Sequence, residues 1–513
     1  MSRSSRIGVI GGGASAVSLL DALSRREEVP ESVTVFEPGP HLWRGRAYQP
    51  DSTTLRVNVP PDDMSLCFGD THHFENWVGT RSRVLGDPDT DYLDPYAAIP
   101  FLPRAVYGDY LEQTARTALT RLAGRGCRIE QVREGVVAAD PSEDLLRLRT
   151  DRGDVRTVDY AVLCVGGGRP ADPYGLTGAP GFVPDPYPVV CRLDGIARDA
   201  DVAVIGSGLT AADVVLTLAN WGHRGRITLL SRRGVLPAVR QRPVEHRLRH
   251  FTPAHFRDLA ARGGTRTLPQ TVEVMRAEIA DAGADWDALV EEISGAGTEH
   301  PVGRMRRHLS GVHDSDLGLR ILQRAVPDTG PDVWPLLPEA DRSALIRDHY
   351  RTIMSLCCPM PPAGATALLE LIDGGRLEIV RGVERVTAEP GGGFLARTAG
   401  GDRPADVVVN AVNAPAHRIP PKAEGLIGSL VAAGMAARHP RGGVHVERAT
   451  SRLVAGGRTW PRLYALGELA SGSLFFTFGV PSLVDRAYDI AEAVSRHAGT
   501  GAVRDGDDVM QTA

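Results

Sequence analysis

Two copies of one glycine-rich pattern constrain the fold of this chain more than any other feature. Each copy reads G-x-G-x-x-A and stands between a short apolar run and a helix-forming stretch. In such a turn the first glycine permits a tight reversal, the second lets the backbone approach a pyrophosphate, and the small third residue lets helix and strand pack closely. The helix then offers free N–H groups to the phosphates. One copy also occurs as a plain structural corner, but two copies in this context predict two dinucleotide-binding units.

The residues that follow each pattern separate the two expected nucleotides. After the first, the run 33–36 ends at Glu37, where a carboxylate would bind the ribose diol of FAD or NAD. After the second, the run 227–230 ends in Ser231, Arg232 and Arg233. Guanidinium groups there are suited to a 2′-phosphate, which favours NADPH over NADH. The alternative is that both arginines only end a strand in solvent. The residues assigned to the second turn are Gly206, Gly208, Leu209, Thr210 and Ala211.

Length and composition predict a large enzyme. The 513 residues exceed one compact core. No apolar run is long enough to span a bilayer, and residues 1–5 lead directly into the first strand, so we expect a cytoplasmic protein with no membrane partner. A net charge of −5 gives no reason to expect nucleic acid, and no cluster has metal-ligand spacing. The six cysteines form no C-x-x-C pair, which argues against a dithiol reductase.

The pattern of apolar runs predicts an α/β fold with two Rossmann-like domains, for FAD and NADPH, and a helical insertion. Strands at 377–380 and 406–411 and the segment 463–497 are expected to return the chain to the first domain. One continuous strand is expected over 127–137. The expected parts are the start of the FAD domain (1–170), the start of the NADPH domain (185–240), the insertion (241–356), a return to the NADPH and FAD domains (357–498) and a polar tail (499–513).

Three further blocks resemble bacterial FAD/NAD(P)-binding proteins with two dinucleotide domains. They comprise residues 45–65, residues 103–111, and the second glycine turn with its continuation to residue 234. The resemblance covers most of the chain except the insertion. Because the chain has no redox cysteine pair, it resembles class B flavin monooxygenases in particular, in which NADPH reduces the flavin and the reduced flavin meets O2 in a dry cavity.

The resemblance also implies which residues contact FAD. Those at the pyrophosphate would be Gly11, Gly13, Ala14, Ser15 and Ala16, and Glu37 would hold the ribose. Along the ribityl chain would lie Trp43, Arg44, Gly45, Arg46 and Ala47. Beside the isoalloxazine would lie Asn58, Val59, Met64 and Ser65, of which Asn58 and Ser65 are candidate catalytic residues. The C-terminal contacts would be Gly467, Glu468 in place of the usual aspartate, and a helix start at Phe478, Gly479, Pro481 and Ser482. For Asn58 the alternative is an Asx turn before the prolines.

The expected reaction follows from a missing motif. No F-x-G-x-x-x-H-x-x-x-W precedes the second turn, which disfavours Baeyer–Villiger oxidation and favours hydroxylation of the nitrogen of a small amine or amino acid. The alternatives are an FAD-dependent oxidoreductase that inserts no oxygen, and a flavin-binding module without turnover. Candidate ligands for a substrate carboxylate are Arg240, Arg242, His349 and Arg351. The alternatives for these are a solvated helix face and a packed histidine.

Overall fold

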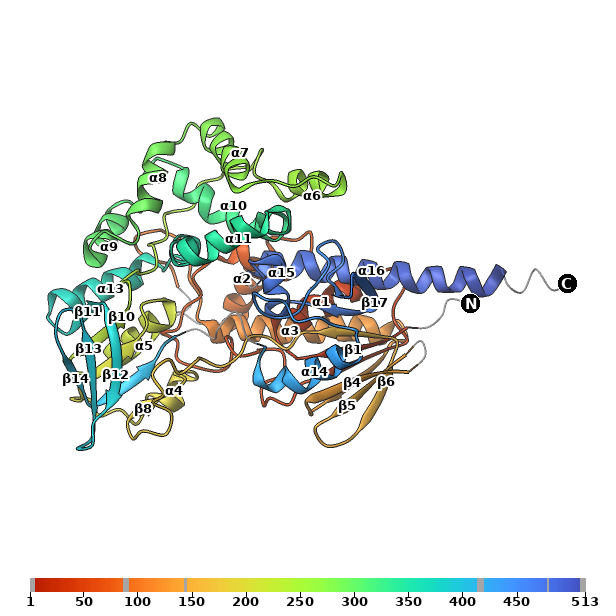
Figure 1. Cartoon of the computed structure of the whole chain (residues 1–513), viewed down its shortest axis with the longest axis horizontal. Helices are drawn as coiled ribbons and strands as arrows, with labels where there is room; N and C mark the ends of the chain where they lie inside the picture. The colour runs from red at the N-terminus through yellow and green to blue at the C-terminus, as the bar shows by residue number, and fades with distance from the viewer. Residues whose placement is uncertain (1–4, 86–91, 143–144, 413–418, 478, 508–513) are drawn as a thin grey trace.

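Two parallel β-sheets form the framework of the chain, and a block of helices lies above the junction between them (Figure 1). The structure is a computed structural model that describes residues 5–85, 92–142, 145–412, 419–477 and 479–507. The predicted α/β fold with two dinucleotide-type units and a helical insertion is therefore confirmed. No helix in these described ranges is both long and apolar enough to cross a membrane.

The first sheet carries the first glycine turn. Its strands, in spatial order, are β16 (Arg452–Ala455), β17 (Arg458–Ala465), β7 (Tyr160–Leu163), β1 (Arg6–Ile10), β2 (Ser32–Phe36) and β3 (Arg128–Val132). All neighbours pair parallel except β16 with β17. One face packs against α1 (Ala14–Ser24), α3 (Arg104–Gly124) and α16 (Val480–Asp507). The other packs against β4 (Val136–Ser142), β5 (Leu145–Thr150), β6 (Val155–Val158) and α14 (Glu424–Ala432).

The second sheet carries the second glycine turn and is parallel throughout. Its strands, in spatial order, are β11 (Leu377–Arg381), β10 (Ile227–Ser231), β9 (Val202–Ile205), β15 (Val407–Asn410) and β8 (Phe182–Val183). One face packs against α4 (Val189–Arg192), α5 (Leu209–Asn220) and α13 (Pro362–Asp373). The other packs against a small antiparallel sheet of β12 (Val383–Ala388), β13 (Phe394–Thr398) and β14 (Arg403–Ala405). The central strands β9, β10 and β15 are almost fully buried between these layers, so they are mostly apolar runs without alternation.

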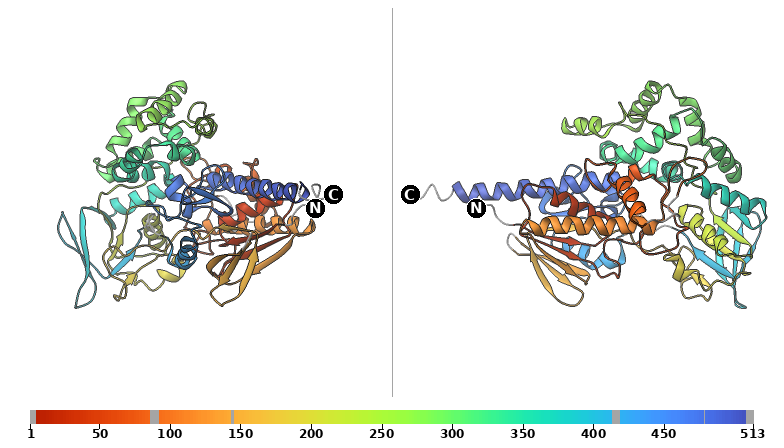
Figure 2. Two further views of the ribbon diagram at one scale, coloured as in Figure 1. Left: turned by 45° about the vertical axis from the view of Figure 1, so that its right-hand side comes forward. Right: turned by 180° about the vertical axis from the view of Figure 1, so that it is seen from behind.

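The insertion between β10 and β11 is helical, with a core of its own. Its elements are α6 (Pro253–Ala261), α7 (Leu268–Asp281), α8 (Trp286–Gly295), α9 (Pro301–Ser310), α10 (Gly318–Val333), η3 (Trp334–Leu336), α11 (Glu339–Ala344), η4 (Leu345–His349) and α12 (Tyr350–Cys357). Figure 2 shows this block from two further sides, above α16 and the second sheet. Shorter elements elsewhere are η1 (Pro61–Met64), α2 (His73–Leu85), η5 (Pro421–Ala423), η6 (Glu468–Ala470) and α15 (Ser471–Leu474).

Three expectations about the course of the chain are wrong. The predicted strand 127–137 is two strands, β3 and β4, which belong to different sheets because the chain breaks at residues 133–135. Strands β11 and β15 join the second sheet, so the chain rejoins the first sheet only at β16 and β17. Helix α16 continues to Asp507, into the segment expected to be a tail. Buried strands of both sheets are apolar runs of similar composition. The sequence therefore does not predict which of the two sheets a strand joins.

Candidate active site

The first glycine turn leaves the start of α1 open. Gly11 has a φ of +108°, and a Cβ there would lie 2.2 Å from the carbonyl oxygen of Cys164, so only glycine fits. Gly13 is the N-cap of α1, and no side chain caps the helix. A Cβ at Gly13 would lie 3.3 Å from the Cα of Gly45, so two glycines face each other beside the free N–H groups. This arrangement fits a pyrophosphate.

Glu37 is held beside this turn. Its carboxylate accepts hydrogen bonds from the backbone N–H groups of Gly12 and Gly39, at 2.8 and 2.7 Å. These two bonds fix the carboxylate at the end of β2, next to the glycine pair. The position agrees with the predicted contact to the adenosine ribose of FAD.

The C-terminal segment closes on the same turn. Gly467 has a φ of +83°, and a Cβ there would lie 2.8 Å from the Ser15 hydroxyl oxygen. The next residue, Glu468, is the predicted substitute for the usual aspartate. Burial raises the pKa of Glu468, and no hydrogen bond or ion pair reaches its carboxylate from the described residues. A buried carboxylate in need of a donor fits a hydroxyl-bearing chain such as the ribityl group of FAD.

The loop predicted to follow the ribityl chain is anchored by its arginines. Arg44 is buried and binds Glu112 and Asp109 of α3 at 2.7 and 2.6 Å. Arg46 forms an ion pair of 2.7 Å with Asp185. These guanidinium groups therefore hold the loop in place. The backbone of the loop is itself tied to the turn, since the N–H of Trp43 donates to the carbonyl of Gly12 at 2.7 Å.

Asn58 stands between the two units. Its side-chain amide donates to the carbonyl of Pro359 at 3.2 Å, and its own carbonyl accepts from Arg240 Nε at 2.8 Å. The Asn58 amide thus bridges distant segments instead of closing a local Asx turn. Ser65, the second catalytic candidate, donates its hydroxyl to the carbonyl of Asp70 within its own loop.

Several other residues with predicted cofactor contacts lie in the core of the first unit or at the start of α16. Val59 is half-buried and Met64 is buried against the first sheet's helices. Helix α16 begins next to the glycine turn, in agreement with the predicted helix start. Gly479, Pro481 and Ser482 lie at this start, and Phe478 lies outside the described residues.

The second glycine turn repeats the geometry of the first. Gly206 has a φ of +125°, and a Cβ there would lie 2.9 Å from the carbonyl oxygen of Ala411. Gly208 is the N-cap of α5, again without a side-chain cap, and a Cβ at Gly208 would meet nothing within 4 Å. The space in front of this helix is open, which fits a second pyrophosphate.

Three arginines gather beside this second turn. Arg232 and Arg233 follow β10, and their guanidinium groups make no hydrogen bond or ion pair with the described residues. Arg351 comes from α12 of the insertion. Partial desolvation, and then the positive charges of Arg232 and Arg233, lower the pKa of Arg351, while all three side chains stay exposed to solvent. Cations that repel one another in this way are stabilised by a bound anion, and a 2′-phosphate carries the charge required.

The four candidates for a substrate carboxylate do not form one site. Arg240 binds the carbonyl of Asn58, and Arg351 lies within electrostatic range of Arg232 and Arg233. Arg242 and His349 are exposed. Arg240 and Arg242 lie in the irregular segment before α6, whereas His349 and Arg351 lie at the boundary of η4 and α12, so the two pairs come from distant parts of the chain.

An acidic group that the sequence did not reveal lies between the insertion and the first unit. Asp328 of α10, Asp63 of η1 and Asp485 of α16 come from three distant segments. Burial and the charges of Asp63 and Asp485 raise the pKa of Asp328 to about 7, against the lowering effect of Arg324. Two arginines face these carboxylates, since Arg324 pairs with Asp328 at 3.8 Å and Arg257 pairs with Asp485 at 3.1 Å.

We expect Asp328→Asn to change stability in a pH-dependent way. The pKa of Asp328 is higher in the folded protein than in the unfolded chain, so the protonated side chain favours the folded state. This contribution to the unfolding free energy is present at pH 4 and is lost as pH rises through about 7. The variant should therefore exceed the wild type in unfolding free energy by about 1–2 kcal/mol at pH 8 and by little at pH 4. Chemical unfolding at both pH values measures this, with exposed Asp402→Asn as the control. An equal difference at both pH values would contradict the account.

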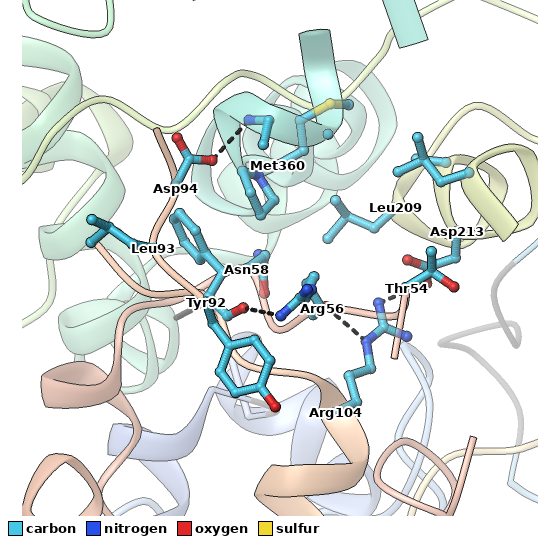
Figure 3. Close-up of a pocket in the computed structure, with 16 residues that line it drawn as sticks. Thr54, Arg56, Asn58, Tyr92, Leu93, Asp94, Arg104, Leu209, Asp213 and Met360 are labelled. Carbon is cyan, nitrogen blue, oxygen red and sulfur yellow. Dashed lines mark hydrogen bonds and ion pairs between the residues drawn. The ribbon is translucent and has the colours of Figure 1, made fainter. Parts of the chain in front are cut away.

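A cavity of about 160 Å³ separates the two units beside Asn58 (Figure 3). Arg104 at the start of α3 crosses this junction to form an ion pair of 2.7 Å with Asp213 of α5. Arg104 also donates to the hydroxyl of Tyr187 at 3.0 Å. The two glycine turns are thus fixed relative to each other by a buried charged contact.

The cysteines are not arranged for thiol chemistry. All six are free, and Cys67, Cys127, Cys164 and Cys357 are buried. Burial raises the pKa of Cys67 and of Cys358 to about 12. A thiol held in its neutral form is a poor nucleophile, so neither Cys67 nor Cys358 suits disulfide exchange.

Comparison with known protein families supports the nucleotide-binding assignment of the first unit. Residues 8–168 match the model of an FAD-NAD(P)-binding family, which confirms the predicted dinucleotide-binding domain. No curated protein sequence matches the chain.

Three solved structures share its fold. Ornithine hydroxylase PvdA from Pseudomonas aeruginosa, in its reduced form, is 16% identical with a TM-score of 0.57, over 96% of this chain and 100% of that one. Ornithine N-hydroxylase KtzI from Kutzneria sp. 744 gives the same identity, coverage and TM-score. The cadaverine monooxygenase DfoA from Erwinia amylovora, bound to FAD, is 13% identical with a TM-score of 0.60, over 96% and 94%. At these identities the likeness is one of fold.

Proposed function

We propose that this chain is an NADPH- and O2-dependent FAD monooxygenase that hydroxylates the nitrogen of a small amine or amino acid. The observation that carries the proposal is the pair of uncapped glycine turns, with an arginine cluster beside the second only. One turn suits FAD, the other suits a coenzyme with a 2′-phosphate. The fold shared with hydroxylases of ornithine and cadaverine supports the same reaction by analogy.

The two glycine turns and the junction between them suit this reaction better than they suit the reduction of a disulfide. FAD, when bound, accepts hydride from NADPH and supplies the electrons for oxygen activation. Glu468 would hold its ribityl chain, while Asn58 would orient groups at the junction. A cytoplasmic location belongs to the same proposal.

The alternative function is electron transfer without oxygen insertion. Both functions consume NADPH, so the product decides between them. Incubation of the FAD-loaded enzyme with NADPH in air and a set of amines, including ornithine, lysine and cadaverine, should give an N-hydroxylated product by mass spectrometry. Oxidation of NADPH with no amine-derived product, and rapid reduction of an artificial acceptor, would support the alternative.

We expect Asn58→Ala to uncouple the reaction. The Asn58 side chain bridges the two units through its bond to the Pro359 carbonyl, so loss of this bond should loosen the water-excluding junction while leaving FAD bound. Flavin reduction by NADPH should stay within about threefold of the wild type, and hydrogen peroxide should replace most of the hydroxylated product. Peroxide and product are measured per NADPH consumed. Unchanged coupling would give Asn58 a purely structural role.

A further inference from the structure

The interdomain cavity contains a guanidinium group that the site described above does not use. Arg56 and Asn58 both line this cavity, as expected for alternate residues of an extended segment, which point to the same side (Figure 3). The Arg56 group donates one hydrogen bond, to the carbonyl of Phe101 at 3.1 Å, and lies 4.7 Å above the ring of Tyr92. Its remaining N–H groups have no partner among the described residues.

The acids that line the cavity do not balance this charge. Asp213 is paired with Arg104 at 2.7 Å. Asp94 accepts hydrogen bonds from the backbone N–H groups of Tyr96, Ala97 and Ala363. Burial lowers the pKa of Arg56, as expected for a cation without a carboxylate partner. A half-buried cation without a carboxylate partner is stabilised by an anion.

The position of the cavity indicates which anion. One wall is formed by the first two turns of α5, including Leu209 and Asp213, and Asn58 and Arg56 lie between this wall and Tyr92 (Figure 3). The free N–H groups of α5 are the expected contact for the coenzyme pyrophosphate. The nicotinamide must pass from there to the flavin, and Arg56 stands on that route.

We propose that Arg56 binds the phosphate on the nicotinamide side of NADPH and so holds the nicotinamide half of the coenzyme in this cavity. The inference rests on the proposed function, since it assumes that NADPH reduces FAD. It assigns the two ends of the coenzyme to different segments. Arg232 and Arg233 hold the adenosine end, and Arg56 holds the nicotinamide end from the opposite domain. Arg56 is thereby a coenzyme-positioning residue outside either glycine turn.

Binding of coenzyme fragments tests this assignment on the FAD-loaded enzyme. The probes are NADP⁺, nicotinamide mononucleotide and adenosine 2′,5′-bisphosphate, measured by calorimetry or by competition with NADP⁺. Arg56→Gln should weaken NADP⁺ and nicotinamide mononucleotide by about ten- to a hundredfold, the loss of one charge-assisted contact. It should leave adenosine 2′,5′-bisphosphate within about twofold. Arg56→Lys should restore part of the loss, and exposed Arg116→Gln on α3 should change nothing.

A measurement on the wild type keeps the test independent of folding. Nicotinamide mononucleotide should bind at least about tenfold more tightly than nicotinamide riboside, which lacks the phosphate. Equal binding of the two compounds, or equal loss for all three probes in Arg56→Gln, would overturn the assignment. An effect confined to the Michaelis constant of the amine would assign Arg56 to the substrate instead. If wild-type protein bound NADP⁺ in none of these assays, the proposed function would fail as well, and the two failures are thus distinguishable.

Discussion

Gly13→Val should yield a protein without FAD. The γ-methyl groups of valine would enter the space between Gly13 and Gly45, where a Cβ alone already lies 3.3 Å from the Gly45 Cα. Overpacking of this kind costs about 1–3 kcal/mol, or roughly ten- to a hundredfold in affinity, before the clash with the pyrophosphate is added. The purified variant should be colourless, whereas the wild type should be yellow and release FAD on denaturation.

The control for this variant is Gly79→Ala on α2, where a Cβ would meet nothing within 4 Å. That protein should bind FAD as the wild type does. A yellow Gly13→Val protein, or a wild type that cannot be reconstituted with FAD, would contradict the assignment of the first turn. Circular dichroism shows whether either variant is unfolded.

Neutralising Arg232 and Arg233 together should remove the preference for NADPH. Each charge-assisted contact to a phosphate contributes about 1.5–3 kcal/mol, so the double change to Gln should raise the Michaelis constant for NADPH by at least about a hundredfold. The constant for NADH, which has no 2′-phosphate, should change by less than about threefold. Arg351→Gln should also raise the Michaelis constant for NADPH, but by a smaller factor, because Arg351 approaches the pair from the insertion.

The matched control is Arg347→Gln, an exposed arginine of the same insertion that pairs with Asp348 at 2.8 Å. It should leave both coenzymes unaffected. Equal changes for NADPH and NADH in the double variant would return Arg232 and Arg233 to a solvated strand end.

The sequence predicts the parts of this fold that depend on local chemistry. Both glycine turns are identifiable because a positive φ and a close backbone approach demand glycine at Gly11 and Gly206. A helical insertion is predicted over residues 241–356, and α7 and α8 are among the helices found there. Glu37 follows from its distance along the chain.

What the sequence does not predict depends on long-range contacts. Arg351 joins Arg232 and Arg233 only because α12 packs beside the end of β10, with the N–H of Ala238 donating to the carbonyl of Ser355 at 2.9 Å. Asp63 and Asp328 lie within electrostatic range of each other although they are 265 positions apart in the sequence. Arg56 is one of 58 basic residues, and nothing in its neighbours distinguishes it until the second unit closes the cavity around it. Tertiary packing, and not local pattern, assembles these groups.

Oxygen isotope incorporation tests the central claim most directly. The FAD-loaded enzyme is reduced with NADPH without air, mixed with ¹⁸O2 and an amine that it turns over, and the product is analysed by mass spectrometry. The account predicts an N-hydroxylated product that carries one ¹⁸O atom, formed in amounts close to the NADPH consumed. Reoxidation of the flavin with all of the isotope recovered as hydrogen peroxide or water, and with the amine unchanged, would contradict it.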